Sequence, residues 1–472
     1  MKTKLLAISV AVSFLMLGTV SAQEENSTME SLLEHIKHLE NRIVELETTR
    51  VEDPVTDLEK QINVLGTNAL AGDNDFTVSW GKSRKFATSD KTFQLTTGGR
   101  IMNDWIFGTQ DDDYEDAIVG DATSAPLGKL QDGTEFRRAR LYTKGVLYDN
   151  IVFKLDFGFE GGDADFKDAY IGIKNVAHLG TILVGQMKIP FGLEYMASSR
   201  FITFNERSMG NDAFIADRGT GIRVNNTAFE GDRLAWYVAI YREADTFGDS
   251  ALKDGQYNFA ARVSGLPWYE EDGKKLLHLG VGVNWRNPSQ AKSGASRFRF
   301  RSQPETHLGP RVVDTDNFEA DSAFLWNAEI ALVLHSFSVQ GELFYAMVDS
   351  DTANDPNFYG FNVQVSYFLT GEHRPYKKSA GAFDRVKVKN NFMNGEGGAG
   401  AWELATRFSM IDLNDGNIEG GEAWTLTGAV TWYLNPSTQV KLNYIYANVD
   451  NTVGGSQEGQ AHIITLRFQI DF

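Results

Sequence analysis

The sequence predicts an all-β membrane barrel of about 16 antiparallel strands, preceded by a short N-terminal α-helical coiled coil. Apolar and polar residues alternate with a period of two from about residue 93 to the last residue. The 472 residues include 45 Gly and only 10 Pro, and aromatic residues make up 12% of the chain. A membrane barrel accounts for both observations, because its strands alternate lipid-facing with lumen-facing side chains and it carries aromatic girdles and Gly-rich turns.

Residues 1–22 have the pattern of a secretory signal peptide. Two lysines precede an apolar run that ends at Leu17, and residues 20–22 form a small-residue cleavage site. The apolar run is shorter than the roughly 20 residues that a membrane-spanning helix needs. We therefore expect the mature chain to begin at Gln23.

A heptad pattern follows the signal peptide and predicts a coiled coil within a periplasmic segment and linker, 23–70. Apolar residues recur at alternating spacings of three and four between Met29 and Leu46, with charged residues between them. A single amphipathic helix packed on its own barrel is the alternative, because fewer than three heptads are marginal for an isolated helix. A secondary role as a tether to peptidoglycan also stays open for this segment.

Residues 90–472 divide into sixteen period-two segments, which predict the transmembrane barrel. The last segment places Ile464, Phe468 and Phe472 on one face and polar residues on the other. An even number of strands is typical of single-chain bacterial barrels, and sixteen strands enclose an aqueous channel. The predicted strands are 92–107, 136–148, 150–160, 166–174, 179–187, 218–226, 233–243, 255–264, 276–286, 323–335, 336–347, 357–369, 400–410, 423–434, 438–449 and 459–472.

The connections between these strands differ in length at the two ends of the barrel. Those at 108–135, 188–217, 244–254 and 287–322 fall at one end, which we take as the outer side, and most of the others are short turns. The inner connection 370–399 is an exception, since it is long, basic and Gly-rich. A connection of this length generally has a function of its own.

Charged residues at a constriction decide what a pore transmits, and two arginine-rich stretches are candidates. Arg297, Arg299 and Arg301 would share one side of an extended segment at spacings of about 7 Å. The alternative is a solvated edge whose intervening phenylalanines pack against the wall. At the start of a predicted strand, Arg138 and Arg140 share a face that we expect to line the lumen, because arginine is costly in lipid. Arg137 would then lie opposite and serve a loop or subunit contact.

The outer connection 188–217 is a third candidate, because it combines cations with hydroxyl groups that suit oxyanions. Internal ion pairs with Glu194 and Glu206 are the alternative for its cations. The residues concerned are Lys188, Ser198, Ser199, Arg200 and Arg207.

Several motifs resemble the phosphate-selective porin O and P family, in the same order along the chain. The resemblance covers about 90–472 and implies a trimer of sixteen-stranded barrels, with two outer loops and one periplasmic turn entering each lumen. The motifs are Leu95-Thr96-Thr97-Gly98-Gly99-Arg100, Phe136-Arg137-Arg138-Ala139, Phe191-Gly192-Leu193-Glu194, Leu369-Thr370-Gly371-Glu372, Trp402-Glu403-Leu404-Ala405 and Trp432-Tyr433-Leu434-Asn435-Pro436.

The resemblance also implies a central anion site. Tyr195 departs from the family pattern, which has a lysine there, although Arg200 keeps a cation five residues later. This departure puts high phosphate selectivity in doubt. The implied site residues are Arg137, Arg138, Asp168, Ser198 and Ser199, with Arg297, Arg299 and Arg301 as an arginine ladder and Lys377, Lys378, Arg385, Lys387 and Lys389 as a basic periplasmic exit.

We therefore expect a passive outer-membrane diffusion channel with anion preference, with phosphate or a related oxyanion as the solute. The alternative is a weakly selective porin for small organic solutes. We expect no enzyme, since the eight His are scattered and no nucleophile with an aligned His is apparent. We also expect no metal or cofactor. The expected partners are two further copies in a homotrimer, outer-membrane lipid, small anions and peptidoglycan; the net charge of −18 argues against nucleic acid.

Overall fold

A computed structural model describes residues 34, 37–38, 76–80, 83–117, 130–244, 247–248, 257–290, 296–393, 395, 397–451 and 457–472. The chain forms two units, Met1–Asp75 and Phe76–Phe472. The predicted signal peptide lies outside the described residues, and so does the predicted coiled coil apart from three positions. Among the described residues, no helix is long and apolar enough to cross a membrane.

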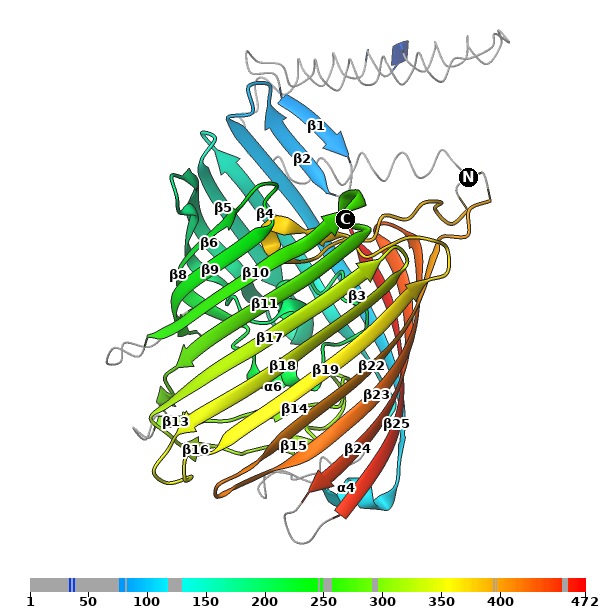
Figure 1. Cartoon of the computed structure of the whole chain (residues 1–472). Helices are drawn as coiled ribbons and strands as arrows, with labels where there is room; N and C mark the ends of the chain where they lie inside the picture. Colours follow the sequence, from blue (N-terminus) through cyan, green and yellow to red (C-terminus); the bar gives the residue numbers. More distant parts are fainter. Residues whose placement is uncertain are drawn as a thin grey trace. The chain divides into compact units, whose positions relative to one another are not determined.

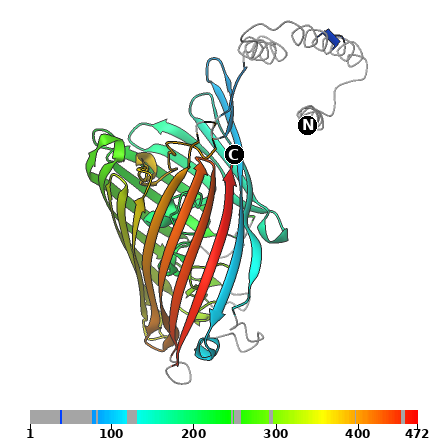
Figure 2. The same cartoon turned by 90° about the vertical axis from the view of Figure 1, so that its right-hand side faces the viewer.

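The second unit is a closed antiparallel barrel of sixteen strands (Figures 1 and 2). Strand β25 closes it by pairing with β3, from Ala461 opposite Gln110 to Asp471 opposite Arg100. Each predicted strand corresponds to one strand of the barrel. These are β3 Phe93–Gln110, β4 Gly133–Leu147, β5 Ile151–Gly158, β6 Asp165–Val176, β7 Gly180–Lys188, β8 Arg218–Ala228, β9 Leu234–Glu243, β10 Asn258–Glu270, β11 Lys275–Arg286, β17 Ser322–Leu334, β18 Phe337–Asp349, β19 Asn357–Phe368, β22 Ala401–Asp415, β23 Ile418–Asn435, β24 Thr438–Asn451 and β25 Gln457–Asp471.

A hairpin that the sequence did not predict extends the sheet at the inner end of the barrel. Its strands are β1, Phe76–Trp80, and β2, Arg84–Thr88, and β2 pairs with the first residues of β3. The backbone of Phe472 hydrogen-bonds to that of Gly99, so the pairing between β25 and β3 ends at the C-terminus. Beyond that point, β2 takes the position beside β3. Five-residue strands span too few periods for the alternation to be recognised.

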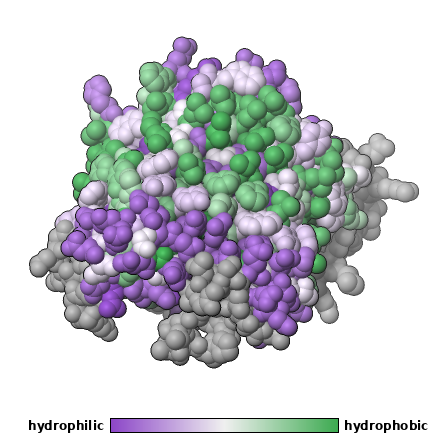
Figure 3. Space-filling view, turned by 60° about the horizontal axis from the view of Figure 1, so that its bottom comes forward, coloured by the Kyte–Doolittle hydropathy of each residue, from purple (hydrophilic) through white to green (hydrophobic). Residues whose placement is uncertain are grey.

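The outer wall carries the apolar side chains of the alternating pattern. In β11, Leu279 and Trp285 are 46% and 45% exposed, whereas the inward-facing His278 and Asn284 are fully buried. Figure 3 shows hydrophobic residues gathered over the wall and hydrophilic residues at the outer rim. This distribution matches a barrel whose outer surface is solvated by lipid.

Three connections fold into the lumen and fill part of it. The β7–β8 connection carries α5, Leu193–Met196, and α6, Met209–Phe214. Aromatic side chains from the outer connections and the wall form the core, for example Phe214 stacked on Phe344. The second is the β11–β17 connection, which carries β12 Ser289–Gln290, β13 Ser296–Phe298, β14 Arg301–Ser302, β15 Val313–Asp314 and β16 Phe318–Glu319. The third is the inner connection, which carries β20 Tyr376–Lys377, η3 Lys378–Ala380 and β21 Ala382–Phe383. Further short helices are α4 Asp112–Ala117, η1 Glu160–Gly162 and η2 Glu271–Gly273.

The inward side chains of β25 hold these lumen segments. Arg467 forms a bidentate ion pair with Asp104 of β3, at 2.7 and 2.6 Å, and also contacts Glu206 of the β7–β8 connection at 2.6 Å. Asp471 pairs with Arg385 of the inner connection. The strand that closes the barrel therefore also fastens two lumen segments.

The lumen is filled unevenly around its circumference. On β17, β18 and β19, about every second residue points inward and is buried beneath the lumen segments. On β4 to β6 and on β8, the residues of both faces are mostly half-buried. Open space therefore lies along the β4 to β8 side of the barrel.

Candidate selectivity site

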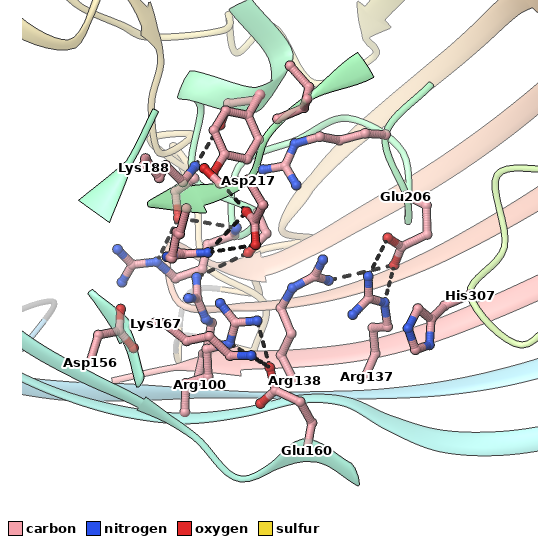
Figure 4. Close-up of a pocket in the computed structure, with 18 of the residues that line it drawn as sticks. Arg100, Arg137, Arg138, Asp156, Glu160, Lys167, Lys188, Glu206, Asp217 and His307 are labelled. Atoms are coloured by element: carbon pink, nitrogen blue, oxygen red, sulfur yellow. Dashed lines mark hydrogen bonds and ion pairs between the residues drawn. The ribbon is translucent and has the colours of Figure 1, made fainter. Parts of the chain in front are cut away.

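A cavity of about 680 Å³ lies between the β4 to β8 wall and the lumen segments. Figure 4 shows charged side chains pointing into it from both sides. Seven carboxylates face twelve cations among the described residues that line it. The cations are Arg100, Arg137, Arg138, Arg140, Lys144, Lys154, Lys167, Lys188, Arg200, Arg207, Arg218 and Arg311, and the carboxylates are Asp156, Glu160, Asp168, Glu206, Asp212, Asp217 and Glu305.

A β-bulge in β4 places two neighbouring arginines on the same side. Met102 pairs with Arg138 and Asn103 with Phe136, so Arg137 is the extra residue. Arg137 therefore lines the cavity beside Arg138, which corrects the expectation that it would lie opposite. Bulges of this kind redirect a side chain, and they are frequent next to functional sites.

Glu206 is the shared partner of these arginines. It accepts two hydrogen bonds from Arg137, at 2.9 and 3.0 Å, and lies 3.6 Å from Arg138. Burial raises the pKa of Glu206, but the charges of Arg137, Arg138 and Arg467 outweigh burial and hold that pKa well below its usual range. The alternative from the sequence was that Glu206 neutralises cations of its own connection. Among the described residues, Glu206 pairs instead with arginines of β4 and β25.

A second irregularity in the ladder lies between β5 and β6. Leu155 pairs with Ala169 and Phe157 with Phe166, which leaves Lys167 and Asp168 against one residue of β5. Asp168 receives ion pairs from Lys154 and from Arg218, the latter at 2.9 Å. This predicted site residue therefore lies in the cavity wall and partly neutralises two cations.

Arg140 is also paired, since its guanidinium lies 2.6 Å from Glu160. Lys167 lies 3.4 Å from the same carboxylate. The cations at this part of β4 are therefore partly compensated. Arg138, Arg140 and Lys144 occur at even spacings along β4 and all line the cavity.

The two predicted serines lie in the β7–β8 connection and bind arginines. Ser199 Oγ accepts a hydrogen bond from Arg100 at 3.1 Å, and Ser198 Oγ accepts one from Arg200 at 3.2 Å. Arg200 also lies 3.6 Å from Asp471. Both hydroxyl groups line the cavity.

Tyr195 is 3% exposed and lies between two cations. Lys188 Nζ lies 4.6 Å from the centre of its ring and the Arg207 guanidinium 5.3 Å. The Tyr195 hydroxyl donates to Asp217 Oδ1 at 2.7 Å. Burial by itself raises the pKa of Asp217. The charge of Arg218 and this hydrogen bond have the larger, opposite effect, so the pKa of Asp217 is lowered to about 2. Cations thus surround the position where the family pattern has a lysine.

The predicted arginine ladder of the β11–β17 connection does not line this cavity. Arg297 and Arg301 are exposed, and Arg299 pairs with Asp314 at 2.7 Å. Phe298 and Phe300 are buried between them and join the aromatic core. The residues alternate as expected, but the arrangement is the solvated edge that the sequence left open as the alternative.

The five basic residues of the inner connection have different surroundings. Arg385 is buried against Asp471, while Lys378 and Lys389 donate to backbone carbonyls of Gly231 and Gly371 at 2.8 and 2.6 Å. Lys377 and Lys387 are exposed. None of the five is among the described residues that line the cavity.

Sequence reasoning missed six cations of the cavity. Strand parity could have found Lys144, which lies six residues after Arg138 on the same face of β4. Arg100 ends a motif that was noted only for its resemblance. The others need the three-dimensional arrangement, because they come from separate elements. The missed residues are Arg100, Lys144, Lys154, Lys167, Arg218 and Arg311.

A closed sixteen-stranded barrel with a lipid-facing wall and a charged, narrowed lumen is an outer-membrane porin. The family model described as phosphate-selective porin O and P matches residues 118–472. The chain belongs to this family, and its location is the bacterial outer membrane.

Three individual proteins are also similar to this chain. Porin O of Pseudomonas aeruginosa is 25% identical over 421 residues, which cover 81% of this chain and 90% of that protein. An uncharacterized protein of Caulobacter vibrioides is 24% identical over 407 residues, covering 84% and 77% respectively. Among solved structures, an anion-selective porin from Comamonas acidovorans has a TM-score of 0.49 at 12% identity, covering 80% of this chain and all of that one.

Proposed function

We propose that this porin is a passive diffusion channel that prefers anions, and that phosphate or a related oxyanion is its solute. The observation that carries the proposal is the excess of cations over carboxylates around the cavity. Four of these cations, Arg100, Lys144, Lys188 and Arg207, have no carboxylate within 4.0 Å among the described residues.

The negative net charge of the whole chain does not oppose this proposal. Charges on exposed loops act over a Debye length of about 8 Å at physiological ionic strength. A narrow cavity with low-dielectric walls instead focuses the field of the charges that line it. The local excess of arginine and lysine therefore decides which ion enters.

The degree of selectivity is the second part of the proposal. Glu206 and Glu160 partly neutralise Arg137, Arg138 and Arg140. These pairs favour a moderate anion preference over an exclusive one. They also support the alternative solutes, small organic molecules, of which we expect organic anions to pass best.

Reversal-potential measurements across a planar bilayer with a potassium chloride gradient test the proposal. We expect a sign that corresponds to chloride preference, and a smaller current when sulfate or phosphate is added. Preference for potassium would overturn the proposal. Equal passage of neutral sugars and organic anions would favour the weakly selective alternative.

We further propose that the protein is a homotrimer, with the segment 23–70 in the periplasm and in contact with peptidoglycan. The family resemblance supports the trimer, and the heptad pattern from 29 to 46 supports the segment's role. Mass measurement in mild detergent should give three copies. Isolated peptidoglycan should retain the full protein and release a variant that lacks 23–70.

A further inference from the structure

We propose that the low side of the barrel, which comprises β5 to β8 and the outer part of β4, is the surface that contacts a second copy of this chain. The inference rests on the proposed homotrimer and names the part of the wall that forms its contacts. The sequence offered only Arg137 for a subunit contact. The bulge in β4 turns Arg137 into the lumen and leaves Phe136 on the outer face instead.

The wall is lower on this side than along β22 to β25. β5 has 8 residues and β7 has 9, whereas β23 has 18 and β25 has 15. Figure 1 shows β5 and β6 near the end that carries β1 and β2, whereas β24 and β25 continue to the opposite end, beside α4. Eight residues of a strand tilted by about 40° rise about 20 Å, and the lipid-facing band of a membrane barrel is about 25 Å tall. β5 therefore falls short of that band.

The outer part of β4 has a neighbouring strand on one side only. The last residue of β5, Gly158, lies opposite Arg140, whereas β4 pairs with β3 as far as Gly133. Among the described residues, no barrel strand pairs with 133–138 on the side of β5. Open strand edges do not face lipid, because hydrocarbon offers no hydrogen-bond partner to the backbone. This edge therefore requires protein beside it.

Charged groups lie at the step where β5 ends. Arg140, opposite Gly158, lies 2.6 Å from the carboxylate of Glu160, and Lys167 lies 3.4 Å from the same carboxylate. Lipid at this step would bring hydrocarbon against these ion pairs, and burying charges in an apolar medium is costly. A neighbouring protein wall can instead keep a polar environment around them.

Exposed phenylalanines surround the same step. Phe136 is 62% exposed, Phe247 56% and Phe159 48%. Phe159 follows β5, and its backbone donates to the carbonyl of Ala139 at 2.8 Å. Phe247, from the β9–β10 connection, packs edge-on against Phe166 of β6, with the ring centres 5.9 Å apart. Aromatic side chains are enriched in contacts between proteins, so these residues provide the apolar part of a subunit interface.

A polar residue interrupts the apolar stripe of β3 directly opposite Phe136. Asn103 lies between the exposed Ile101 and Trp105 on the outer face. Its side chain donates to the carbonyl of Glu135 at 3.0 Å and accepts a hydrogen bond from Trp105 Nε1 at 2.9 Å. A carboxamide here departs from the apolar pattern of a lipid-facing wall.

A second copy of the chain is the occupant that matches the shape of the whole wall. Each barrel has one low side and one tall side, β22 to β25, whose outer face carries exposed apolar residues such as Leu426 and Leu442. In a closed ring of identical subunits, all low sides turn toward the common axis and all tall sides turn toward lipid. Each copy then covers the step of its neighbour.

Contact with lipid chains tests this surface. The chain has no Cys, so a single introduced Cys carries the only thiol label. In trimers reconstituted with brominated lipids, a fluorescent label at Leu442→Cys should lose most of its emission. Labels at Phe136→Cys and Ile171→Cys, on the low side, should lose little. Equal quenching at all three positions in intact trimers would overturn the inference.

The stability of the trimer provides a second measurement. Phe136→Ser should raise the rate of trimer dissociation in detergent by about tenfold or more, because each subunit loses one buried aromatic side chain. Leu442→Ser, on the lipid-facing side, is the matched control and should leave that rate unchanged. Equal rates in the two variants, with heat-resistant barrels in both, would refute the contact, and so would a different polypeptide in the purified complex. A single copy in the unmodified protein would instead defeat the proposed homotrimer itself.

Discussion

Glu206→Gln should make the porin more anion-selective and less stable at the same time. The carboxylate accepts two hydrogen bonds from Arg137 and one from Arg467 at 2.6 Å, and its side chain is 14% exposed. Gln keeps the shape but loses the charge that these guanidinium groups share. Charge-assisted hydrogen bonds contribute about 1.5–3 kcal/mol each, so we expect a loss of about 3 kcal/mol in the free energy of unfolding.

The change in selectivity follows from Coulomb's law. Removing one negative charge about 7 Å from a permeating ion changes its energy by about 0.6 kcal/mol in a water-like dielectric, and by less than half of that after screening. The effect has opposite signs for anion and cation. The ratio of chloride to potassium permeability should therefore rise by roughly two- to eightfold.

Reversal potentials and thermal unfolding in detergent measure the two effects on the same preparation. Glu206→Asp is the matched control, because it keeps the charge and shortens the side chain by one methylene. It should lower stability with little change in selectivity. A drop in anion preference for Glu206→Gln would refute the reasoning, since it would mean that Glu206 acts only by holding the arginines in place.

Three further outcomes follow from the same contacts. Arg467→Met should cost about 3–5 kcal/mol in unfolding free energy, because it leaves the buried Asp104 carboxylate without its partner, and an unchanged melting temperature would contradict this. Replacing Arg297, Arg299 and Arg301 together by Ala should leave the reversal potential in a salt gradient nearly unchanged, because these residues lie outside the cavity lining. A shift to cation preference would instead show that they determine selectivity. The pKa of Glu206 is depressed, so its contribution to stability is present above the ordinary Glu pKa of about 4.3 and is lost only as the pH falls through the lower folded value. Glu206 should therefore stay charged, and selectivity should be constant, between about pH 5 and pH 7. A change of selectivity within that range that depends on Glu206 would be inconsistent with its ion pairs.

The strands could be predicted because each one repeats a simple physical constraint. One face meets lipid and the other meets the lumen, so a period of two persists over eight or more residues in every barrel strand. The β1–β2 hairpin was missed because its strands have only five residues each. The lumen segments could be recognised by their length, but their internal packing depends on contacts with distant strands.

The candidate site was predicted in part for the same reason. Arg138 and Arg140 are two residues apart on β4, so the alternation of side chains along a strand correctly placed both on the lumen face. It failed for Arg137, because a bulge adds one residue and parity arguments assume an unbroken ladder. Arg297, Arg299 and Arg301 share a face, but parity does not say whether that face meets the cavity or the solvent. Carboxylate partners could not be assigned either, since Glu206 and Arg467 are 261 residues apart.

The contacts of β25 bear on the order in which the pore can mature. Arg467 and Asp471 lie within the last six residues, and they fasten the β7–β8 and inner connections as well as the seam with β3. These fastenings need the C-terminal strand in its final register. We therefore expect the narrow part of the lumen to be completed only when β25 pairs with β3, because the connections that build it gain their last anchors from β25. The barrel should then acquire its permeability barrier together with its closure.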